Sequence, residues 1–127
     1  MSGISHVSVG TNDVARAKAF YDPLMQLVGL RIRQTDAESV DYGNDQLVFS
    51  LETPSDRRRA TAGNGVHIAF IAPDRETVDA FHREALRLGG RDAGAPGLRP
   101  QYGPDYYGAF VLDPDGNKIE AVTETAP

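Results

Sequence analysis

The sequence predicts an α+β fold made of two paired β-α-β-β-β modules, and three observations carry this prediction. The chain has 127 residues, 40% of them hydrophobic, which is enough for one compact domain with a real core. Residues 4–29 and 65–90 align without a gap, as two copies of one unit. Each copy is followed by short apolar runs separated by turn residues, as in consecutive strands. We therefore expect a single domain, residues 1–127, with repeat modules at approximately 4–52 and 65–123.

The internal repeat is supported by the residue types that coincide at a constant spacing. The coinciding pairs are His6 and His67, Asp13 and Asp74, Phe20 and Phe81, Leu27 and Leu88, and Gly29 and Gly90. Agreement of histidine, aromatic, acidic and glycine positions is typical of an internal duplication. Neither unit could bury its own apolar face, so we expect the two modules to pack together.

The first module is expected to begin with a strand over residues 5–10, where polar and apolar side chains alternate. A helix should follow, capped by Asn12 or Asp13 and running to about Leu27. Pro23 is its weak point, because a proline inside a helix kinks or ends it. The three strands that complete the module are expected over residues 30–35, 39–43 and 46–52.

The second module repeats this order, with a strand over residues 65–72 and a helix from Asp74 to Leu88. A short strand near 91–93 should come next. The Gly- and Pro-rich segment 93–105 that follows is predicted to be a loop too irregular for regular structure. The last two strands are expected over residues 106–113 and 117–124, joined by a DPDG turn.

Strand alternation places three side chains of metal-ligand type on the face turned away from the helices, namely His6, His67 and Glu120. A lone carboxylate among apolar residues is costly unless something pairs with it. Two imidazoles and a carboxylate suit one divalent metal ion, Fe, Mn, Ni or Zn. The alternative for each histidine alone is a hydrogen-bonded structural role. His82, inside the second helix, is expected to lie on the helix surface or at a helix–sheet contact.

The loop before the seventh strand supplies candidate substrate contacts, which are Arg99, Tyr102, Tyr106 and Tyr107. Arg99 could bind a carboxylate or phosphate, and a tyrosine hydroxyl could act as an acid or hydrogen-bond donor. Equally open is that the tyrosines pack against the sheet or against a second chain. Lys118 shares the alternation of Glu120 and could meet an anionic ligand, although a solvated lysine is the simpler interpretation.

Composition and charge exclude several function classes. The formal net charge of −5 and the pI near 5.0 argue against a nucleic-acid surface, which would need a basic stripe. The absence of cysteine excludes disulfides and thiolate chemistry. No segment has the length and hydropathy of a membrane span, and the N-terminus lacks the apolar region of a signal peptide. A cytoplasmic location is therefore the default expectation.

Taken in order, four segments resemble the vicinal oxygen chelate superfamily, which includes glyoxalase I, extradiol dioxygenases, fosfomycin-resistance thiol transferases and bleomycin-binding proteins. The segments are ISHVSV, FYDPLMQLVGL, GVHIAF and VLDPDGNKIEAV. The resemblance implies that the modules form a U-shaped, half-barrel mixed sheet around a metal site, with the helices on the outer face. It also implies a homodimer, and it matches His6, His67 and Glu120 to the ligands of the first, fifth and eighth strands.

The fourth-strand position is where the chain departs from glyoxalase I, which has a carboxylate ligand there. The alignment of LVFSLE places Ser50 at this position, while Glu52 has the same alternation two residues on. Either residue could line the cavity as a substrate contact. With Ser50 at this position the protein ligands number three, as in the dioxygenases and the fosfomycin-resistance enzymes.

The expected function is that of a metal-dependent enzyme of the glyoxalase/dioxygenase type, acting on a small substrate with adjacent oxygens that the metal polarises. Lyase, dioxygenase and thiol transferase chemistry all remain open. The alternative is a non-catalytic protein that binds a small molecule or drug, as the bleomycin-binding relatives do, and its acidic surface would suit a cationic ligand. In both cases the partner is a small molecule, without nucleic acid or membrane.

Overall fold

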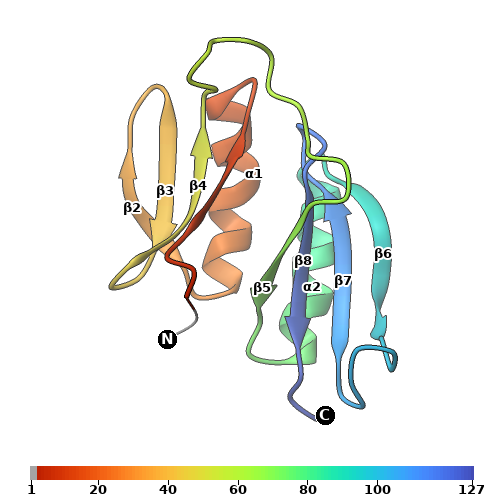
Figure 1. Cartoon of the computed structure of the whole chain (residues 1–127). Coiled ribbons are helices and arrows are strands. Elements are labelled where there is room, and N and C mark those ends of the chain that lie inside the picture. Colours follow the sequence, from red (N-terminus) through yellow and green to blue (C-terminus); the bar gives the residue numbers. More distant parts are fainter. Residues whose placement is uncertain (1–2) are drawn as a thin grey trace.

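Two β-α-β-β-β modules follow one another along the chain, as a computed structural model that describes residues 3–127 shows (Figure 1). The first module contains β1 (Val7–Gly10), α1 (Val14–Leu27), β2 (Arg31–Thr35), β3 (Ser39–Gly43) and β4 (Leu47–Glu52). The second contains β5 (His67–Ile71), α2 (Arg75–Arg87), β6 (Arg91–Leu98), β7 (Tyr107–Leu112) and β8 (Lys118–Thr123). The predicted α+β class and the internal repeat are confirmed.

Each module forms its own open, mixed sheet of four strands, in the orders β1-β4-β3-β2 and β5-β8-β7-β6. The first and last strands of each module pair in parallel, and the other pairs are antiparallel. The two sheets lie side by side with a helix behind each, and the segment 53–66 passes over the top from one module to the other (Figure 1). Strands β1 and β5 therefore each lie at the edge of a sheet.

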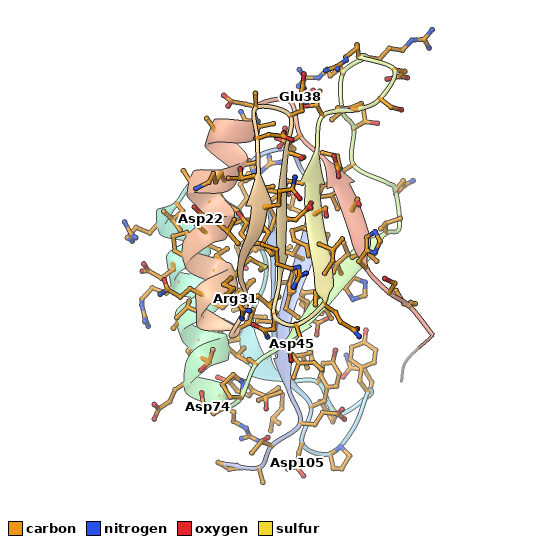
Figure 2. The ribbon with its side chains drawn as sticks, turned by 90° about the vertical axis from the view of Figure 1, so that its left-hand side faces the viewer. Asp22, Arg31, Glu38, Asp45, Asp74 and Asp105 are labelled. Atoms are coloured by element: carbon orange, nitrogen blue, oxygen red, sulfur yellow. The ribbon has the colours of Figure 1, made fainter. Side chains whose placement is uncertain are left out.

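Helix α1 continues through Pro23 to Leu27, although a proline removes one helical hydrogen bond. One tertiary contact and one contact within the helix hold the chain on the N-terminal side of this proline. The Asp22 carboxylate accepts hydrogen bonds from the Tyr42 hydroxyl at 2.7 Å and from Lys18 Nζ at 2.6 Å. Figure 2 shows Asp22 on this helix. No helix in the described residues 3–127 is long and apolar enough to cross a membrane.

Helix α2 is fixed to its sheet by polar as well as apolar contacts. His82 is buried, and its Nε2 lies 3.0 Å from Asp92 Oδ1 on β6, which confirms the expected helix–sheet contact. The Tyr107 hydroxyl donates to Asp79 Oδ1 at 2.6 Å, and this hydrogen bond, with burial, raises the pKa of Tyr107. The Arg75 guanidinium lies 5.1 Å from the centre of the Tyr107 ring.

Strand β6 is longer than the sequence indicated, since it extends to Leu98 through Gly94, Pro96 and Gly97. The expectation of an irregular loop from residue 93 onward is therefore wrong for this segment. The register with β7 shifts on both sides of Gly94, so bulges absorb the residues that disfavour regular pairing. Because β6 lies at the sheet edge, the missing N–H of Pro96 is tolerated.

The hydrophobic core is continuous across the two modules. Phe49 of β4 and Phe70 of β5 meet edge to face, with ring centroids 5.1 Å apart. A Cβ placed on Gly90 would lie 2.9 Å from the ring of Phe20, so this glycine makes room for an aromatic side chain of the other module. The shared core confirms that the modules pack together as expected.

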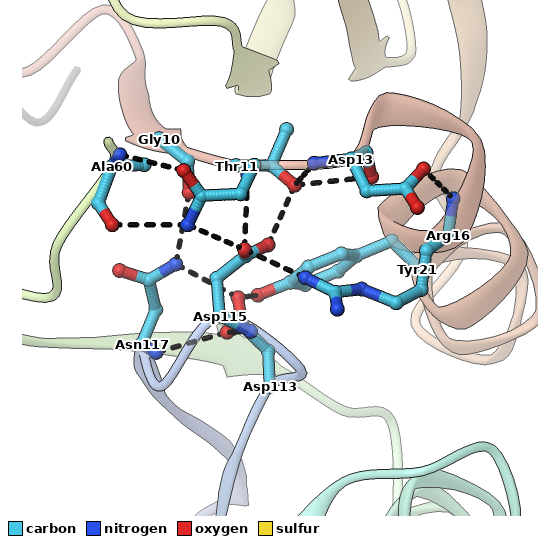
Figure 3. Close-up of polar contacts among 10 residues, drawn as sticks. Gly10, Thr11, Asp13, Arg16, Tyr21, Ala60, Asp113, Asp115 and Asn117 are labelled. Atoms are coloured by element: carbon cyan, nitrogen blue, oxygen red, sulfur yellow. Dashed lines mark hydrogen bonds and ion pairs between the residues drawn. The ribbon is translucent and has the colours of Figure 1, made fainter. Parts of the chain in front are cut away.

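A polar turn, defined here as Asp113, Asp115 and Asn117, ties the second module to the first (Figure 3). Asp115 accepts hydrogen bonds from Thr11 Oγ1 at 2.6 Å and from Arg16 Nη2 at 2.8 Å, and its side chain is only 3% exposed. The backbone N–H of residue 12 donates to the same carboxylate at 3.0 Å. The DPDG segment thus forms the expected turn and also binds the N-terminal end of α1.

The second carboxylate of the polar turn lies deeper. Asp113 accepts a hydrogen bond from the Tyr21 hydroxyl at 2.6 Å and two more from Asn117, through its backbone N–H at 2.9 Å and its Nδ2 at 3.0 Å. Burial and the Asp113 carboxylate raise the pKa of Tyr21 well above its usual range, so its hydroxyl stays a donor. Asn117 Nδ2 also donates to the carbonyl of Gly10 at 3.2 Å.

Candidate functional site

The candidate site is a cavity of about 570 Å³ on the sheet of the second module. Strand alternation puts it on the face opposite α2, because the residues of β8 that alternate with Glu120 belong to the core. Five of the predicted site residues line it, namely His67, Glu120, Arg99, Tyr102 and Tyr106. Phe110 and Lys118 complete the part of the wall that carries rings and charges.

Glu120 is the centre of the polar contacts in this cavity. It is 0% exposed, yet its carboxylate meets two polar side chains. Its Oε1 lies 3.0 Å from His67 Nε2, and its Oε2 accepts a hydrogen bond of 2.5 Å from the Tyr106 hydroxyl. The His67 side chain is 45% exposed, so the pair is open to the cavity on the imidazole side.

The parallel pairing of β5 and β8 explains why His67 and Glu120 meet. In this register His67 is the partner of Lys118, and Ala69 is the partner of Glu120. Lys118 and Glu120 are two residues apart on β8, so their side chains share a face of the sheet. His67 shares that face as the register partner of Lys118. The alternation that predicted a common face for these two residues is thus seen in the strand register.

Gly108 on β7 leaves the space that the Glu120 carboxylate occupies. A Cβ at this position would lie 2.9 Å from Glu120 Oε2 and 3.4 Å from the ring of Tyr106. We expect Gly108→Ala to lower the free energy of unfolding by about 1–3 kcal/mol, because a buried and hydrogen-bonded carboxylate has to move. Thermal denaturation followed by circular dichroism measures this loss.

Gly103→Ala is the matched control for this substitution. Its Cβ would meet Glu124 Oε1 at 3.4 Å and Tyr106 Cβ at 3.8 Å, both ordinary contact distances. We expect its melting temperature to stay within about 2 °C of the wild-type value. Equal melting temperatures for Gly108→Ala and wild type would show that the space beside Glu120 is not tightly filled.

Tyr106 is a neutral hydrogen-bond donor in this site. Burial is the largest cause that raises the pKa of Tyr106 well above the ordinary value of a tyrosine. The hydrogen bond to Glu120 and the charge of that carboxylate raise it further. The Tyr102 ring lies against it, with centroids 5.2 Å apart. Tyr106 thus holds one oxygen of Glu120, while the other oxygen faces His67.

His6 lies apart from the other two predicted ligands. It precedes β1, is exposed, and its Nδ1 lies 3.0 Å from the hydroxyl of Ser5. Within residues 3–127 no group of three or more His, Asp or Glu side chains is arranged to hold a metal ion. One chain thus brings His67 and Glu120 together and leaves His6 on the surface of the other module.

The register of the first sheet resolves which residue of β4 corresponds to Glu120. Ser50 pairs with Ser8 of β1, as Glu120 pairs with Ala69 of β5, and the repeat offset relates Ser8 to Ala69. Ser50 is therefore the structural counterpart of Glu120. It is buried and donates a hydrogen bond of 2.8 Å to Asp41, a carboxylate for which the sequence pattern had indicated no role.

Glu52 and Tyr107 also lie outside the cavity. Glu52 is partly exposed at the end of β4, where burial and then the charges of Asp41 and Asp36 raise its pKa. Tyr107 faces α2 through its bond to Asp79. Of the residues predicted to contact substrate, Ser50, Glu52 and Tyr107 are thus absent from the cavity wall, and Arg99, Tyr102 and Tyr106 are present.

Comparison with known proteins identifies the family. The model of the glyoxalase/bleomycin resistance protein/dioxygenase superfamily matches residues 3–121. A glyoxalase/bleomycin resistance protein from Albidiferax ferrireducens T118 is 37% identical, with a TM-score of 0.85 over 95% of this chain and 98% of that chain. The chain therefore belongs to this superfamily, as its resemblance predicted.

Other solved structures are similar in fold. Lactoylglutathione lyase from Agrobacterium tumefaciens is 23% identical, with a TM-score of 0.63 over 96% of this chain and 93% of that chain. A glyoxalase-related enzyme from Fulvimarina pelagi is 18% identical, with a TM-score of 0.73 over 96% and 88%. Among curated proteins, no relative matches the sequence.

Proposed function

We propose that the protein is a metal-dependent enzyme of the glyoxalase/dioxygenase type, in which His67 and Glu120 supply two ligands of one divalent ion. The contact between these two side chains carries the proposal, since a fully buried carboxylate faces a cavity beside a half-exposed imidazole. A buried carboxylate is costly without a cation or donors. Imidazole nitrogen and carboxylate oxygen fit Fe, Mn, Ni or Zn, so the donor set suits such an ion.

The third ligand in this proposal is His6 of a second copy of the chain. His6 is exposed, and β1 and β5 are edge strands with one neighbour each. Large apolar side chains lie exposed in or next to these strands, with Ile71 at 82% and Val66 at 58%. A homodimer that covers them would bury apolar area and could bring His6 to the His67–Glu120 pair.

A bound divalent ion supplies a Lewis acid that polarises adjacent oxygens of a substrate and stabilises developing negative charge. The chain's own residues prepare the site for it. Tyr106 fixes the carboxylate of Glu120 by donating to Oε2, and the cavity of about 570 Å³ fits a small molecule. Lyase, dioxygenase and thiol transferase reactions share this requirement. A cytoplasmic location remains a prediction from the sequence.

Metal content tests the premise directly. We expect purified wild-type protein to retain a divalent metal after dialysis, measured by mass spectrometry of the elements, and the His67→Ala/Glu120→Ala double variant to lose it. Circular dichroism confirms that the variant is folded. Equal metal content in the two proteins would refute the site.

Mixed dimers test whether the site is shared between chains. His6→Ala and Glu120→Ala proteins should each lack metal, whereas a dimer of one with the other contains one intact site. We expect co-expression, with different affinity tags on the two chains, to restore about half of the wild-type metal content. The control pairs His67→Ala with Glu120→Ala, which cannot restore a site because both residues come from one module. Restoration in both pairs, or in neither, would contradict a shared site.

Ligand binding without catalysis is the second candidate, since the cavity itself and the 37% identity to a glyoxalase/bleomycin resistance protein are compatible with it. The cations Arg99 and Lys118 in the cavity disfavour the cationic ligand that the acidic composition had indicated. Thermal stabilisation by a ligand that persists in strong chelator, without turnover, would favour this candidate over the enzyme.

A further inference from the structure

We propose that the cavity binds its substrate through a carboxylate held between Arg99 and Lys118, so that the substrate class is a small organic acid. The inference rests on the proposed function in that it names the substrate class for the same site. Two cations, each beside the same aromatic ring on the cavity wall, are the feature that carries it.

The ring of Phe110 contacts both cations and also His67, which neighbours Lys118 in the register of β5 with β8. Arg99 Cζ is 5.6 Å and Lys118 Nζ is 5.0 Å from its centroid. Phe110 is also the direct partner of Glu120 in the register of β7 with β8, and the His67 ring meets it edge on at 5.8 Å. A ligand lying on this ring would therefore be within reach of both cations as well as of His67 and Glu120.

Both cations are available to a ligand. Among residues 3–127, neither Arg99 nor Lys118 forms an ion pair with a carboxylate. Arg99 Nη2 donates one hydrogen bond of 2.7 Å to the carbonyl oxygen of Ala95, which leaves most of the guanidinium donors free. This bond orients the guanidinium without neutralising it.

Two glycines of β6 leave the space that the Arg99 guanidinium occupies. A Cβ at Gly97 would lie 3.1 Å from its Nη1, and a Cβ at Gly94 would lie 3.4 Å from its Nη2. Side chains at these two positions would therefore crowd the guanidinium. Gly94 and Gly97, which lie at the bulges of β6, thus also leave room for the guanidinium of Arg99. This cation lies on the sheet of a protein whose net charge is −5.

Charge and shape favour a carboxylate as the bound group. Of the residues that line the cavity, Glu120 is the acidic one, and its two oxygens already face Tyr106 and His67. A planar carboxylate matches the fork of an arginine, and an uncharged isostere would leave both cations unpaired. Discrimination between an acid and its amide is therefore the expected signature.

The test uses the metal-free chain, residues 1–127, with phenylacetate and phenylacetamide as a charged and an uncharged probe of the same shape. We expect phenylacetate to bind at least about tenfold more tightly by calorimetry, because charge-assisted hydrogen bonds are about twice as strong as neutral ones. Arg99→Gln and Lys118→Gln should each remove about tenfold of phenylacetate affinity and leave phenylacetamide unaffected. Arg91→Gln, an exposed change at the start of β6, is the control and should bind as wild type does.

Three outcomes would overturn the inference: equal affinity for the two probes, unchanged phenylacetate binding by both glutamine variants, or no binding of phenylacetate at all. Tighter binding of benzylphosphonate than of phenylacetate would replace the carboxylate with a phosphonate and so also refute it. Because no metal is present, these results are independent of the metal measurement. If the protein binds phenylacetate selectively but retains no metal, only the proposed function is refuted. If it retains metal but does not prefer phenylacetate to phenylacetamide, only this inference is refuted.

Discussion

Replacing Glu120 with glutamine is expected to abolish tight metal binding while the fold remains. The substitution keeps the size of the side chain and an oxygen for the Tyr106 hydroxyl, but it removes the negative charge that faces His67. Loss of a residue that merely supports a ligand costs about 10- to 100-fold in metal affinity, so loss of the ligand itself should cost more than about 100-fold. Titration of metal-free protein with Zn²⁺ or Co²⁺, against a competing chelator, measures the change.

Two further measurements separate this effect from general damage. Glu52→Gln removes a partly exposed carboxylate outside the cavity, and its metal affinity should match that of the wild type. The melting temperature of metal-free Glu120→Gln should lie within about 5 °C of the wild-type value, because the buried hydrogen bonds persist. Wild-type metal affinity in Glu120→Gln would remove this residue from the proposed site.

The largest loss of stability is expected for Asp113→Ala in the polar turn. This residue is 3% exposed and accepts hydrogen bonds from Tyr21 and Asn117, so its removal leaves the Tyr21 hydroxyl and the backbone N–H of Asn117 without an acceptor. We expect the free energy of unfolding to fall by about 3–5 kcal/mol. For a domain of this size that corresponds to a drop of more than about 10 °C in melting temperature.

The matched control is Asp45→Ala, in the turn between β3 and β4 that occupies the equivalent place in the first module (Figure 2). Asp45 is exposed, so the change should alter stability by less than about 0.5 kcal/mol. A double-mutant cycle with Tyr21→Phe isolates the hydroxyl–carboxylate contact, and we expect a coupling of about 1–2 kcal/mol. Strictly additive losses would show that Asp113 acts through its other contacts.

The sequence predicted the fold well because the repeat and the strand alternation are local patterns. The same alternation indicated that His67 and Glu120 share a face. The same alternation also distinguishes Tyr107 from the cavity residues. Gly108 and Phe110 lie on the cavity face of β7, so Tyr107 lies on the opposite face, toward the helix. Applied to this strand, alternation separates Tyr106, in the cavity, from Tyr107, bonded to Asp79.

Other features could not be derived from local patterns. The path of β6 depends on how its edge pairs with β7, and the glycines and Pro96 in it favour loops when considered alone. The position of His6 relative to Glu120 depends on how the modules are arranged, which alternation within a strand does not determine. The ring of Phe110 was missed because a lone aromatic in a strand usually belongs to the core, and only the three-dimensional structure places cations beside it.

The polar turn makes the two modules of the chain non-equivalent at their contact. The donors that reach it come from the first module, at Thr11, Arg16 and Tyr21, and the repeat places Ala72, Thr77 and His82 at the matching positions of the second. Two second modules joined in this way would leave the turn's carboxylates without those donors. In two first modules, the equivalent turn would carry a single aspartate, Asp45, in place of Asp113 and Asp115. Unlike halves are therefore the pair in which donors of one module meet carboxylates of the other, so the two repeats are complementary rather than identical at this contact.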